Sequence, residues 1–519
     1  MGIMTAEMVL ASLDSTIKTI AAVSGVHGVS IGVMHYGKVI YNKSFGFRDV
    51  EAQIPGDDDT IYYLGSMTKG FTAEAIAILV EEGKLSWSTR VKDVLPAFQP
   101  NDKIIYEQAT ITDLLSHRTG LERADAFWAQ SSNNILLSRD QALSTINQLR
   151  AVTPFRAEYR YNNWGYEIAG RIIEKLSGKK FSQFLTEKIF EPLGMTRTFN
   201  DDSECHGADN VAQAYMTFDD ASPAHVPRPH MAEGTLMNPA GGIQSCVKDL
   251  LKYYGALMEA AKDQFDSGNT STEGSPLKQV APLLSSNIRT ASRLREQSYA
   301  CGWARVQLPG VLAETSRNQA LMPAMPVMGD ELQPRLVLYH HGMLVGFNNG
   351  VYLFPETDTA IKLFDDPVSY DFVKLARDTA ETARNMIPQI KAQLERERGS
   401  VAAPKSLDKY VGKYYNKVQT FYMHITEKHG VLWMNLQGNK DENYQLHHYN
   451  GDEFTWLMTR NEQVKRGRNP IGYAEYWKIR FGSGNKDDIS KLFWVIEKEL
   501  PGEGMELTKE QGEEHHSEL

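Results

Sequence analysis

The alternation of apolar and polar positions divides the chain into a mixed first part and a strand-rich last part. Period-two alternation over residues 29–47, on both sides of Tyr36-Gly37, predicts a β-hairpin. Apolar residues at helical spacing predict a helix over 68–82, with Gly83 at the position of a C-cap. Shorter patterns predict helices over 111–115, 166–176 and 181–189 and strands over 299–306, 336–340 and 351–354. Strands at both ends of a helical middle predict an α+β unit with an antiparallel sheet flanked by helices.

The pattern changes near residue 399. Residues 372–398 predict a long amphipathic helix broken only at Pro388, and residues 399–405 have the composition of a linker. Short aromatic strands follow at 410–414, 421–425, 431–436, 453–458, 475–480 and 491–496. The sequence therefore predicts a first domain over 1–398, a linker over 399–405, a small antiparallel β-barrel over 406–502 and a disordered acidic tail over 503–519.

Composition narrows the classes of partner and compartment. The 519 residues carry 55 basic and 65 acidic side chains, a net charge of −10, which argues against nucleic acid as a partner. The longest apolar runs, such as 72–80, are too short to span a bilayer, and the first residues lack a secretory pattern. Three cysteines without Cys-x-x-Cys spacing predict buried free thiols, no metal or organic cofactor, and a cytoplasmic protein. The terminal Ser517-Glu-Leu519 differs from a peroxisomal signal at its centre, and the peroxisome is the lesser alternative.

The first candidate catalytic motif is Ser66-Met-Thr-Lys69, at the start of the predicted helix over 68–82. A serine hydroxyl needs a base to become a nucleophile, and residues three apart on a helix are neighbours, so Lys69 can reach Ser66. A helix N-terminus also offers backbone N–H groups to an oxyanion. Ser-x-x-Lys occurs seven times in the chain, however, so the motif needs support from its context.

Two downstream motifs supply that context. Tyr161-Asn-Asn163 precedes the helix predicted over 166–176, and His340-His-Gly342 ends the strand predicted over 336–340. A nucleophile, then Tyr-x-Asn, then a basic residue with glycine two positions later is a specific order.

With these motifs the chain resembles the serine β-lactamase and penicillin-binding-protein superfamily, in particular the class C β-lactamase-like branch with its esterases, D-aminopeptidases and transesterases. Other stretches carry the resemblance from residue 29 to about residue 366, among them Gly46-Phe-Arg-Asp49, Leu114-Leu-Ser-His-Arg-Thr-Gly-Leu121 and Glu191-Pro-Leu-Gly-Met-Thr-Arg-Thr198. Leu407-Asp-Lys-Tyr-Val-Gly-Lys-Tyr414 is similar to the lipocalin-like barrel of some members. The resemblance implies a β-lactamase-like antiparallel sheet with a helical subdomain, plus that barrel.

The resemblance also implies roles for individual residues. Ser66 is the acylated nucleophile, Lys69 its hydrogen-bonded partner and Tyr161 the general base. Because a free tyrosine has a pKa near about 10, this role needs adjacent cations, for which Lys69 and His340 are the candidates. Asn163 binds Lys69 and the substrate, and the backbone N–H groups of Ser66 and Met343 form the oxyanion hole. His340, Gly342 and Trp164 complete the substrate-binding set; for Trp164, packing in the core is the alternative to lining the cleft.

One departure bears on the substrate. Antibiotic-hydrolysing members carry Lys-Thr-Gly where this chain has His340-His341-Gly342, and a histidine mostly neutral at pH 7 is a weaker carboxylate anchor. His341 is an equally basic alternative to His340. The departure favours a serine hydrolase or acyltransferase that acts through an acyl-Ser66 on a small ester, thioester or amide, with water or an acyl acceptor completing the reaction. A catalytically silent scaffold is the alternative, and the oligomeric state stays open.

Overall fold

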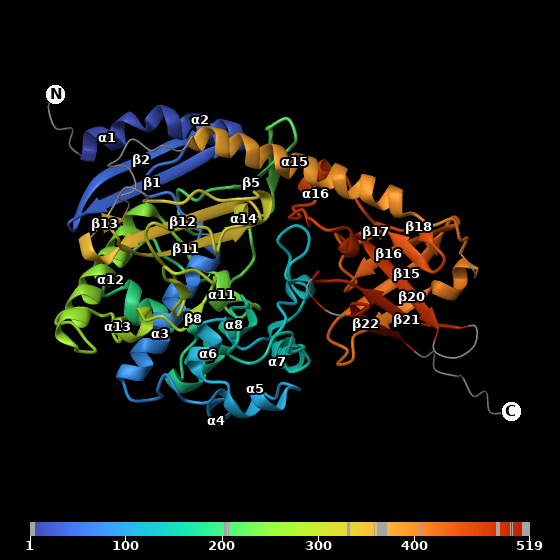
Figure 1. Ribbon diagram of the computed structural model, residues 1–519, viewed down its shortest axis with the longest axis horizontal. Helices are drawn as coiled ribbons and strands as arrows, with labels where there is room; N and C mark the ends of the chain where they lie inside the picture. The colour runs from blue at the N-terminus through green and yellow to red at the C-terminus, as the bar shows by residue number, and fades with distance from the viewer. Residues whose placement is uncertain are drawn as a thin grey trace. The chain divides into compact units, whose positions relative to one another are not determined.

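The structure is a computed structural model that describes residues 6–201, 205, 207–329, 333–357, 359–360, 371–403, 406–483, 488–498, 500 and 502–510 (Figure 1). The chain forms two compact units, the first from 1–123 and 150–383, the second from 124–149 and 384–519. Each is described by itself.

A nine-stranded antiparallel sheet in the order β3-β2-β1-β13-β12-β11-β10-β9-β8 forms the centre of the first unit. Its strands are β1 (Gly28–His35), β2 (Lys38–Asp49), β3 (Ile54–Pro55), β8 (Ile288–Arg289), β9 (Gln297–Tyr299), β10 (Ala304–Gln307), β11 (Leu336–Leu344), β12 (Phe347–Phe354) and β13 (Thr359–Ala360). The predicted hairpin over 29–47 is confirmed, with Tyr36 and Gly37 at positive φ in its turn. Two short pairs lie outside this sheet: β4 (Tyr62–Tyr63) with β7 (Gln244–Ser245), and β5 (Ala214–Thr217) with β6 (Pro223–Val226).

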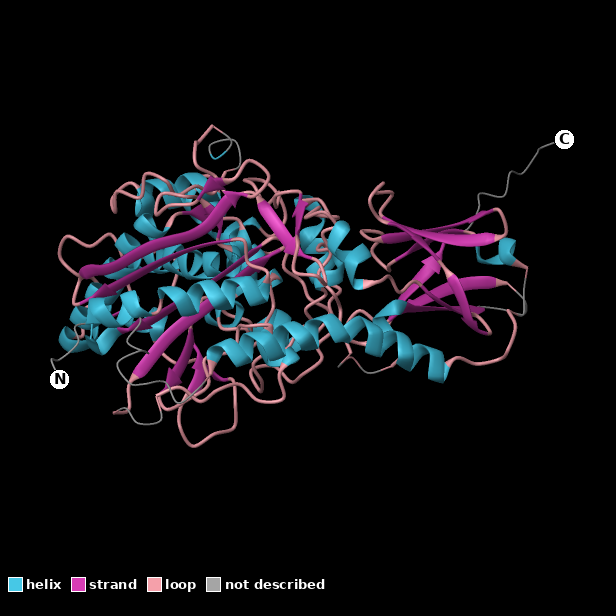
Figure 2. Ribbon diagram, turned by 90° about the horizontal axis from the view of Figure 1, so that it is seen from above, coloured by secondary structure: helices cyan, strands magenta, loops and turns pink. Residues whose placement is uncertain are grey.

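Helices cover both faces of this sheet (Figure 2). Leu10 of α1 (Ala6–Ser12) packs with Val33 and Tyr41 on one face. On the other face, Val247 and Leu251 of α12 (Val247–Ser267) approach Gly32 so closely that a Cβ there would lie 2.4 Å from Val247. The remaining helices of the unit are α2 (Asp14–Ser24), α3 (Thr68–Glu81), α4 (Val91–Val94), α5 (Lys103–Gln108), α6 (Ile111–Leu115), α8 (Trp164–Ser177), α9 (Phe181–Leu185), α11 (Asn238–Gly241), α13 (Val280–Leu284) and α14 (Asn318–Leu321).

Helix α3 is buried on every side, from Thr68 to Leu79. A helix surrounded by protein needs small residues where neighbours approach, and a Cβ at Gly70 would lie 3.1 Å from the Trp303 ring. The sequence predicts one strand over 299–306 here, whereas the structure has two, β9 and β10, joined by a turn in which Gly302 has a φ of +81°. A Cβ at Gly302 would lie 2.8 Å from the carbonyl oxygen of Lys69, so the turn fits tightly over the start of α3.

Glu74 is a fully buried carboxyl on α3, and burial raises its pKa from 4.5 to about 8. The folded protein therefore holds a proton that the unfolded chain releases above pH 4.5, so stability should fall as the pH rises from about 4.5 towards 8. We expect the free energy of unfolding to drop by about 2 kcal/mol between pH 5 and pH 7 through this group.

Urea titrations across that range check this expectation for Glu74. Glu74→Gln, which can still accept the hydrogen bond from the Lys278 backbone N–H, should flatten the slope. The matched control Glu81→Gln, at an exposed position of the same helix, should retain it. Equal slopes in the wild type and Glu74→Gln would contradict the expectation.

The helix predicted over 372–398 is observed as α15 (Phe372–Glu397), but Pro388 lies inside it and does not break it. Pro388 is exposed, so water can bind the carbonyl group that loses its helical partner. The chain passes from the first unit to the second within α15, between residues 383 and 384. The sequence predicts this boundary in a linker over 399–405, of which residues 404–405 lie outside the described part.

The second unit contains a nine-stranded antiparallel sheet in the order β17-β16-β15-β14-β22-β21-β20-β19-β18. Leu446 alone separates β17 from β18, the two outermost strands of this order, so the sheet nearly closes into the expected barrel. The strands are β14 (Gly412–Tyr415), β15 (Tyr422–Lys428), β16 (Val431–Leu436), β17 (Asn443–Gln445), β18 (His447–Asn450), β19 (Glu453–Thr455), β20 (Lys478–Ser483), β21 (Ile489–Trp494) and β22 (Met505–Lys509). The predicted acidic tail over 503–519 starts too early, because residues 505–509 pair with β21 and β14; residues 511–519 lie outside the described part.

Residues 124–149, which the sequence analysis assigns to the first domain, belong to the second unit with α7 (Ala142–Ile146) and α16 (Arg460–Lys465). The Ser131 backbone N–H donates to the carboxylate of Glu442 at 2.6 Å. Arg468 is buried and donates to Glu442 at 3.2 Å and to the Tyr444 hydroxyl at 2.6 Å. This buried network fastens the inserted segment to the barrel.

Across the described residues, no helix is long and apolar enough to cross a membrane. Cys205, Cys246 and Cys301 are buried thiols that no disulfide links, as expected.

Candidate active site

Ser66 lies in the turn η1 (Gly65–Met67), which leads directly into α3. Gly65 has a φ of +56°, and a Cβ there would lie 2.7 Å from the backbone nitrogen of Met343. Both conditions require glycine before the serine. The turn places Ser66 at the positive end of a buried helix, as the sequence predicts.

Lys69 is fully buried beneath the serine. Its Nζ donates to the Ser66 Oγ at 3.0 Å and to the Ala240 carbonyl oxygen at 2.9 Å. The same Nζ lies 5.0 Å from the centre of the Tyr161 ring and 5.3 Å from that of Tyr166. The structure therefore brings together the predicted nucleophile, its lysine and the predicted base.

Strand β11 brings Gly342 and Met343 against the serine turn. A Cβ at Gly342 would lie 1.8 Å from the carbonyl oxygen of Leu64, so no other residue fits while the strand keeps this position. Together with the approach of Gly65 to the Met343 nitrogen, this contact places the backbones that carry the two predicted oxyanion donors side by side.

His340 faces the site, with its ring centre 6.3 Å from that of Tyr161. Its Nδ1 lies 2.7 Å from the His341 carbonyl oxygen, so Nδ1 carries the proton and Nε2 accepts from the Tyr299 hydroxyl at 2.9 Å. Burial, with the nearby charge of Lys69, lowers its pKa to about 3. The expectation that His340 supplies a second cation to Tyr161 is therefore wrong, because its imidazole is neutral; its place in the substrate-binding set stays a prediction.

The alternative residue, His341, points to the opposite face of β11. Its Nδ1 lies 2.8 Å from the Thr315 hydroxyl and its Nε2 lies 2.7 Å from that of Tyr352. Alternation along the strand separates the two histidines, and only His340 belongs to the site.

The hydroxyl of Tyr299 can be tested as a support of the site. Tyr299→Phe leaves Nε2 of His340 without its donor, and we expect the rate of Ser66 acylation to fall about 3- to 10-fold, the range of one hydrogen bond. Tyr352→Phe removes the equivalent bond to His341 and should change the rate less than 2-fold. Equal effects of the two variants would show that a histidine on the active-site face of β11 supports acylation no more than one on the opposite face.

The Tyr161-Asn-Asn163 motif precedes α8, and its middle residue has a role that the sequence analysis missed. The Asn162 side-chain amide donates to the carbonyl oxygens of Leu121 and Glu122, at 3.4 and 2.8 Å. Asn163 is largely buried at the entry to α8. Trp164 is fully buried and its indole N–H donates to the Arg123 carbonyl oxygen at 2.9 Å, so the prediction that it lines the cleft is wrong.

Arg123 is the other residue that the sequence analysis missed. Its guanidinium carbon lies 5.6 Å from the centre of the Tyr161 ring, and the residue is exposed. It lies two positions after the stretch 114–121 quoted above, and nothing in the spacing of the three motifs points to it.

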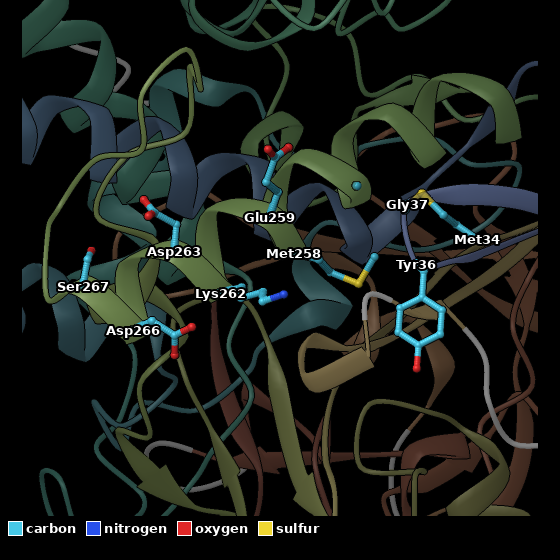
Figure 3. A pocket seen from close by; sticks show the side chains of 10 residues that line it. Met34, Tyr36, Gly37, Met258, Glu259, Lys262, Asp263, Asp266 and Ser267 are labelled. Carbon is cyan, nitrogen blue, oxygen red and sulfur yellow. The ribbon is translucent and has the colours of Figure 1, made fainter.

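A separate pocket of about 760 Å³ lies between α12 and the turn of the β1–β2 hairpin (Figure 3). Met34, Tyr36 and Gly37 line one side and Met258 and Glu259 the other. None of its lining residues is a predicted site residue. The described residues also contain no group of three or more His, Cys, Asp or Glu side chains that could hold a metal ion.

The fold and site together define the β-lactamase and penicillin-binding-protein class, whose members are serine hydrolases. The chain belongs to the beta-lactamase family, whose model matches residues 13–364, and residues 397–509 match a family described as a domain of unknown function (DUF3471).

Curated relatives match only in part. An unguisins hydrolase from Aspergillus campestris is 30% identical over 248 residues, 46% of this chain and 45% of that protein. Penicillin-binding protein 4* from Bacillus subtilis is 30% identical over 234 residues, 43% of this chain and 50% of that protein. The chain thus spans about half the length of these relatives.

A solved structure covers more of the chain. The octameric penicillin-binding protein homologue from Pyrococcus abyssi has a TM-score of 0.54 at 22% identity and covers 96% of this chain and 100% of its own. A class C beta lactamase from Rhodobacter sphaeroides has a TM-score of 0.50 at 22% identity and covers 72% of this chain and 97% of its own. At these identities the likeness shows the fold.

Proposed function

We propose that this protein hydrolyses a small ester or amide through an acyl-Ser66 intermediate. The observation that carries the proposal is the Lys69 Nζ, buried between the Ser66 Oγ at 3.0 Å and the Tyr161 ring at 5.0 Å. A nucleophile, a cation and a phenol that lie together at one site are the parts that an activated serine needs.

The charges around Tyr161 favour its role as base. His340 and His117 are buried, and burial together with the charge of Lys69 lowers the pKa of both imidazoles, so both are neutral. Of these three buried groups, Lys69 therefore carries the positive charge that stabilises negative charge on the Tyr161 oxygen.

The reaction divides into two steps. Tyr161 takes the Ser66 proton as Oγ bonds to the substrate carbonyl carbon, and the oxyanion lies against the N–H groups of Ser66 and Met343. The bond to the leaving group breaks, the leaving group takes the proton, and acyl-Ser66 remains. Water then gives its proton to Tyr161, attacks the acyl carbon and releases the acid with Ser66 Oγ reprotonated.

One relative is named as an unguisins hydrolase, which supports hydrolysis over transfer. Transfer to an acceptor other than water would use the same intermediate. Adding amine or alcohol acceptors and identifying the products separates transfer from hydrolysis.

Intact mass after incubation with a fluorophosphonate tests the nucleophile. We expect one adduct on the wild type and none on Ser66→Ala. Ser15→Ala is the matched control, because Ser15-Thr-Ile-Lys18 has the same spacing but Ser15 is exposed on α2, and it should label like the wild type. An adduct that persists in Ser66→Ala, or no adduct on the wild type, would overturn the proposal.

A further inference from the structure

His117 is a buried residue to which the proposed reaction gives no role. Its backbone has a φ of +59°, in the left-handed region that favours glycine and asparagine over other residues. Residues held in such a conformation persist only where their surroundings fix them, and they cluster at active sites. The contacts of His117 therefore indicate why a histidine stands at this position.

His117 binds the backbone on both sides of Tyr161. The Arg160 N–H donates to the His117 carbonyl oxygen at 2.8 Å, and the Asn162 N–H donates to the His117 Nδ1 at 3.1 Å. Because these two hydrogen bonds bracket Tyr161, they fix the backbone from which its phenol extends.

The imidazole ring of His117 also packs against the phenol itself. The two ring centres are 4.3 Å apart, with 34° between the ring planes. The rings of Tyr299 and Tyr166 lie 4.9 and 5.4 Å from the same imidazole, so it is enclosed and has little room to move. The imidazole thus limits the movement of the Tyr161 ring, whose centre is 5.0 Å from the Lys69 Nζ.

The protonation state of His117 agrees with these contacts. Burial, and after it the charge of Lys69, lowers the pKa of the imidazole well below its ordinary value. The neutral ring keeps Nδ1 free of a proton, as the hydrogen bond from Asn162 requires, and carries its proton on Nε2. Nε2 makes no hydrogen bond within the described residues, so the ring acts through Nδ1 and through its face.

We propose that His117 is a positioning residue for Tyr161, whose backbone it fixes by two hydrogen bonds and whose ring it holds beside Lys69. This inference rests on the proposed function, in which Tyr161 takes the proton of Ser66. A general base must lie within hydrogen-bond reach of the proton that it removes, and a misplacement of about 1 Å can cost about 10²-fold in rate.

The rate constant for labelling of Ser66 by a fluorophosphonate, followed by intact mass, tests the inference. Asparagine suits a positive φ, and its Oδ1 can accept from the Asn162 N–H in place of Nδ1, but it lacks the ring. We expect His117→Asn to slow labelling about 10-fold and His117→Ala, which also lacks the acceptor, about 100-fold. Phe98→Leu is the control, because it removes a buried ring that is not part of the site; it should lower the urea midpoint and keep the wild-type rate.

A double-mutant cycle with Tyr161→Phe separates positioning from a general loss of structure. If His117 acts through the phenol, adding His117→Asn to Tyr161→Phe should slow labelling by less than about 2-fold further. A raised reagent concentration makes the slow reaction of Tyr161→Phe measurable.

The outcomes distinguish this inference from the proposed function. Equal slowing by His117→Asn in both backgrounds, or none in the wild-type background, overturns the role of His117 and leaves the nucleophile intact. Tyr161→Phe that labels as fast as the wild type overturns Tyr161 as the base, and the role of His117 with it. Absence of labelling on the wild type overturns the proposed function as a whole.

Discussion

Lys69→Met should lower kcat/KM for any accepted ester by about 10⁴-fold or more, the range lost when one member of a nucleophile–base pair is removed. Methionine fills a similar volume but gives no donor to the Ser66 Oγ and no charge to Tyr161. With both neighbouring histidines neutral, no buried imidazolium replaces the missing charge.

This experiment needs a check on folding, because Lys69→Met also leaves the buried Ala240 carbonyl oxygen without its donor, at a cost of about 1–3 kcal/mol. Near-UV circular dichroism and a urea midpoint show whether the variant is folded at the assay temperature. Lys18→Met, in the exposed Ser15-Thr-Ile-Lys18 copy of the motif, should keep full activity. A folded Lys69→Met protein that keeps more than a tenth of the wild-type rate would show that Tyr161 needs no lysine.

Gly342→Ala should reduce kcat/KM by about 10³-fold with a smaller effect on KM. The new Cβ would overlap the Leu64 carbonyl oxygen, 1.8 Å away, so β11 must move off the serine turn. Because Met343 follows directly, its N–H leaves the oxyanion position, and losing one such donor typically costs 10²- to 10³-fold, to which the displaced turn adds.

Gly350→Ala is the matched control for this substitution. Gly350 pairs with His341 in the same ladder of β11 and β12. A Cβ at Gly350 would lie 3.2 Å from the His341 ring, which is a side chain and not backbone. We expect a rate within about 3-fold of the wild type. If Gly342→Ala behaves like Gly350→Ala, the contact between β11 and the turn has no part in catalysis.

The parts of the site that the sequence predicts well depend on short-range geometry. Ser66 and Lys69 are three residues apart at the start of one helix, so their hydrogen bond follows once that helix is recognised. Gly342 and Met343 follow a clear apolar strand, and the resemblance to the superfamily placed that strand beside the serine turn.

The features that the sequence did not predict depend on burial and on contacts between residues far apart in the chain. The neutral state of His340 depends on burial and on the charge of Lys69, which no local pattern reveals. Its hydrogen bond with Tyr299, 41 residues earlier, is also visible only in the folded chain. Trp164 and Arg123 are likewise 41 residues apart, and only the folded chain shows the hydrogen bond between them. In the fold, the two-strand hairpin of β9 and β10 was hidden because its turn, residues 300–303, is also buried and largely apolar.

The inserted segment 124–149 changes how the barrel could be exchanged between proteins. Its Ser131 binds Glu442 and Tyr444, 311 and 313 residues later in the chain. A gene fusion or truncation made at residue 399 would move only one of two pieces and would leave the buried Glu442 and Arg468 without the partner that Ser131 supplies. Recombination that preserves the second unit must therefore carry two separate stretches of coding sequence, those for residues 124–149 and for residues 384–519.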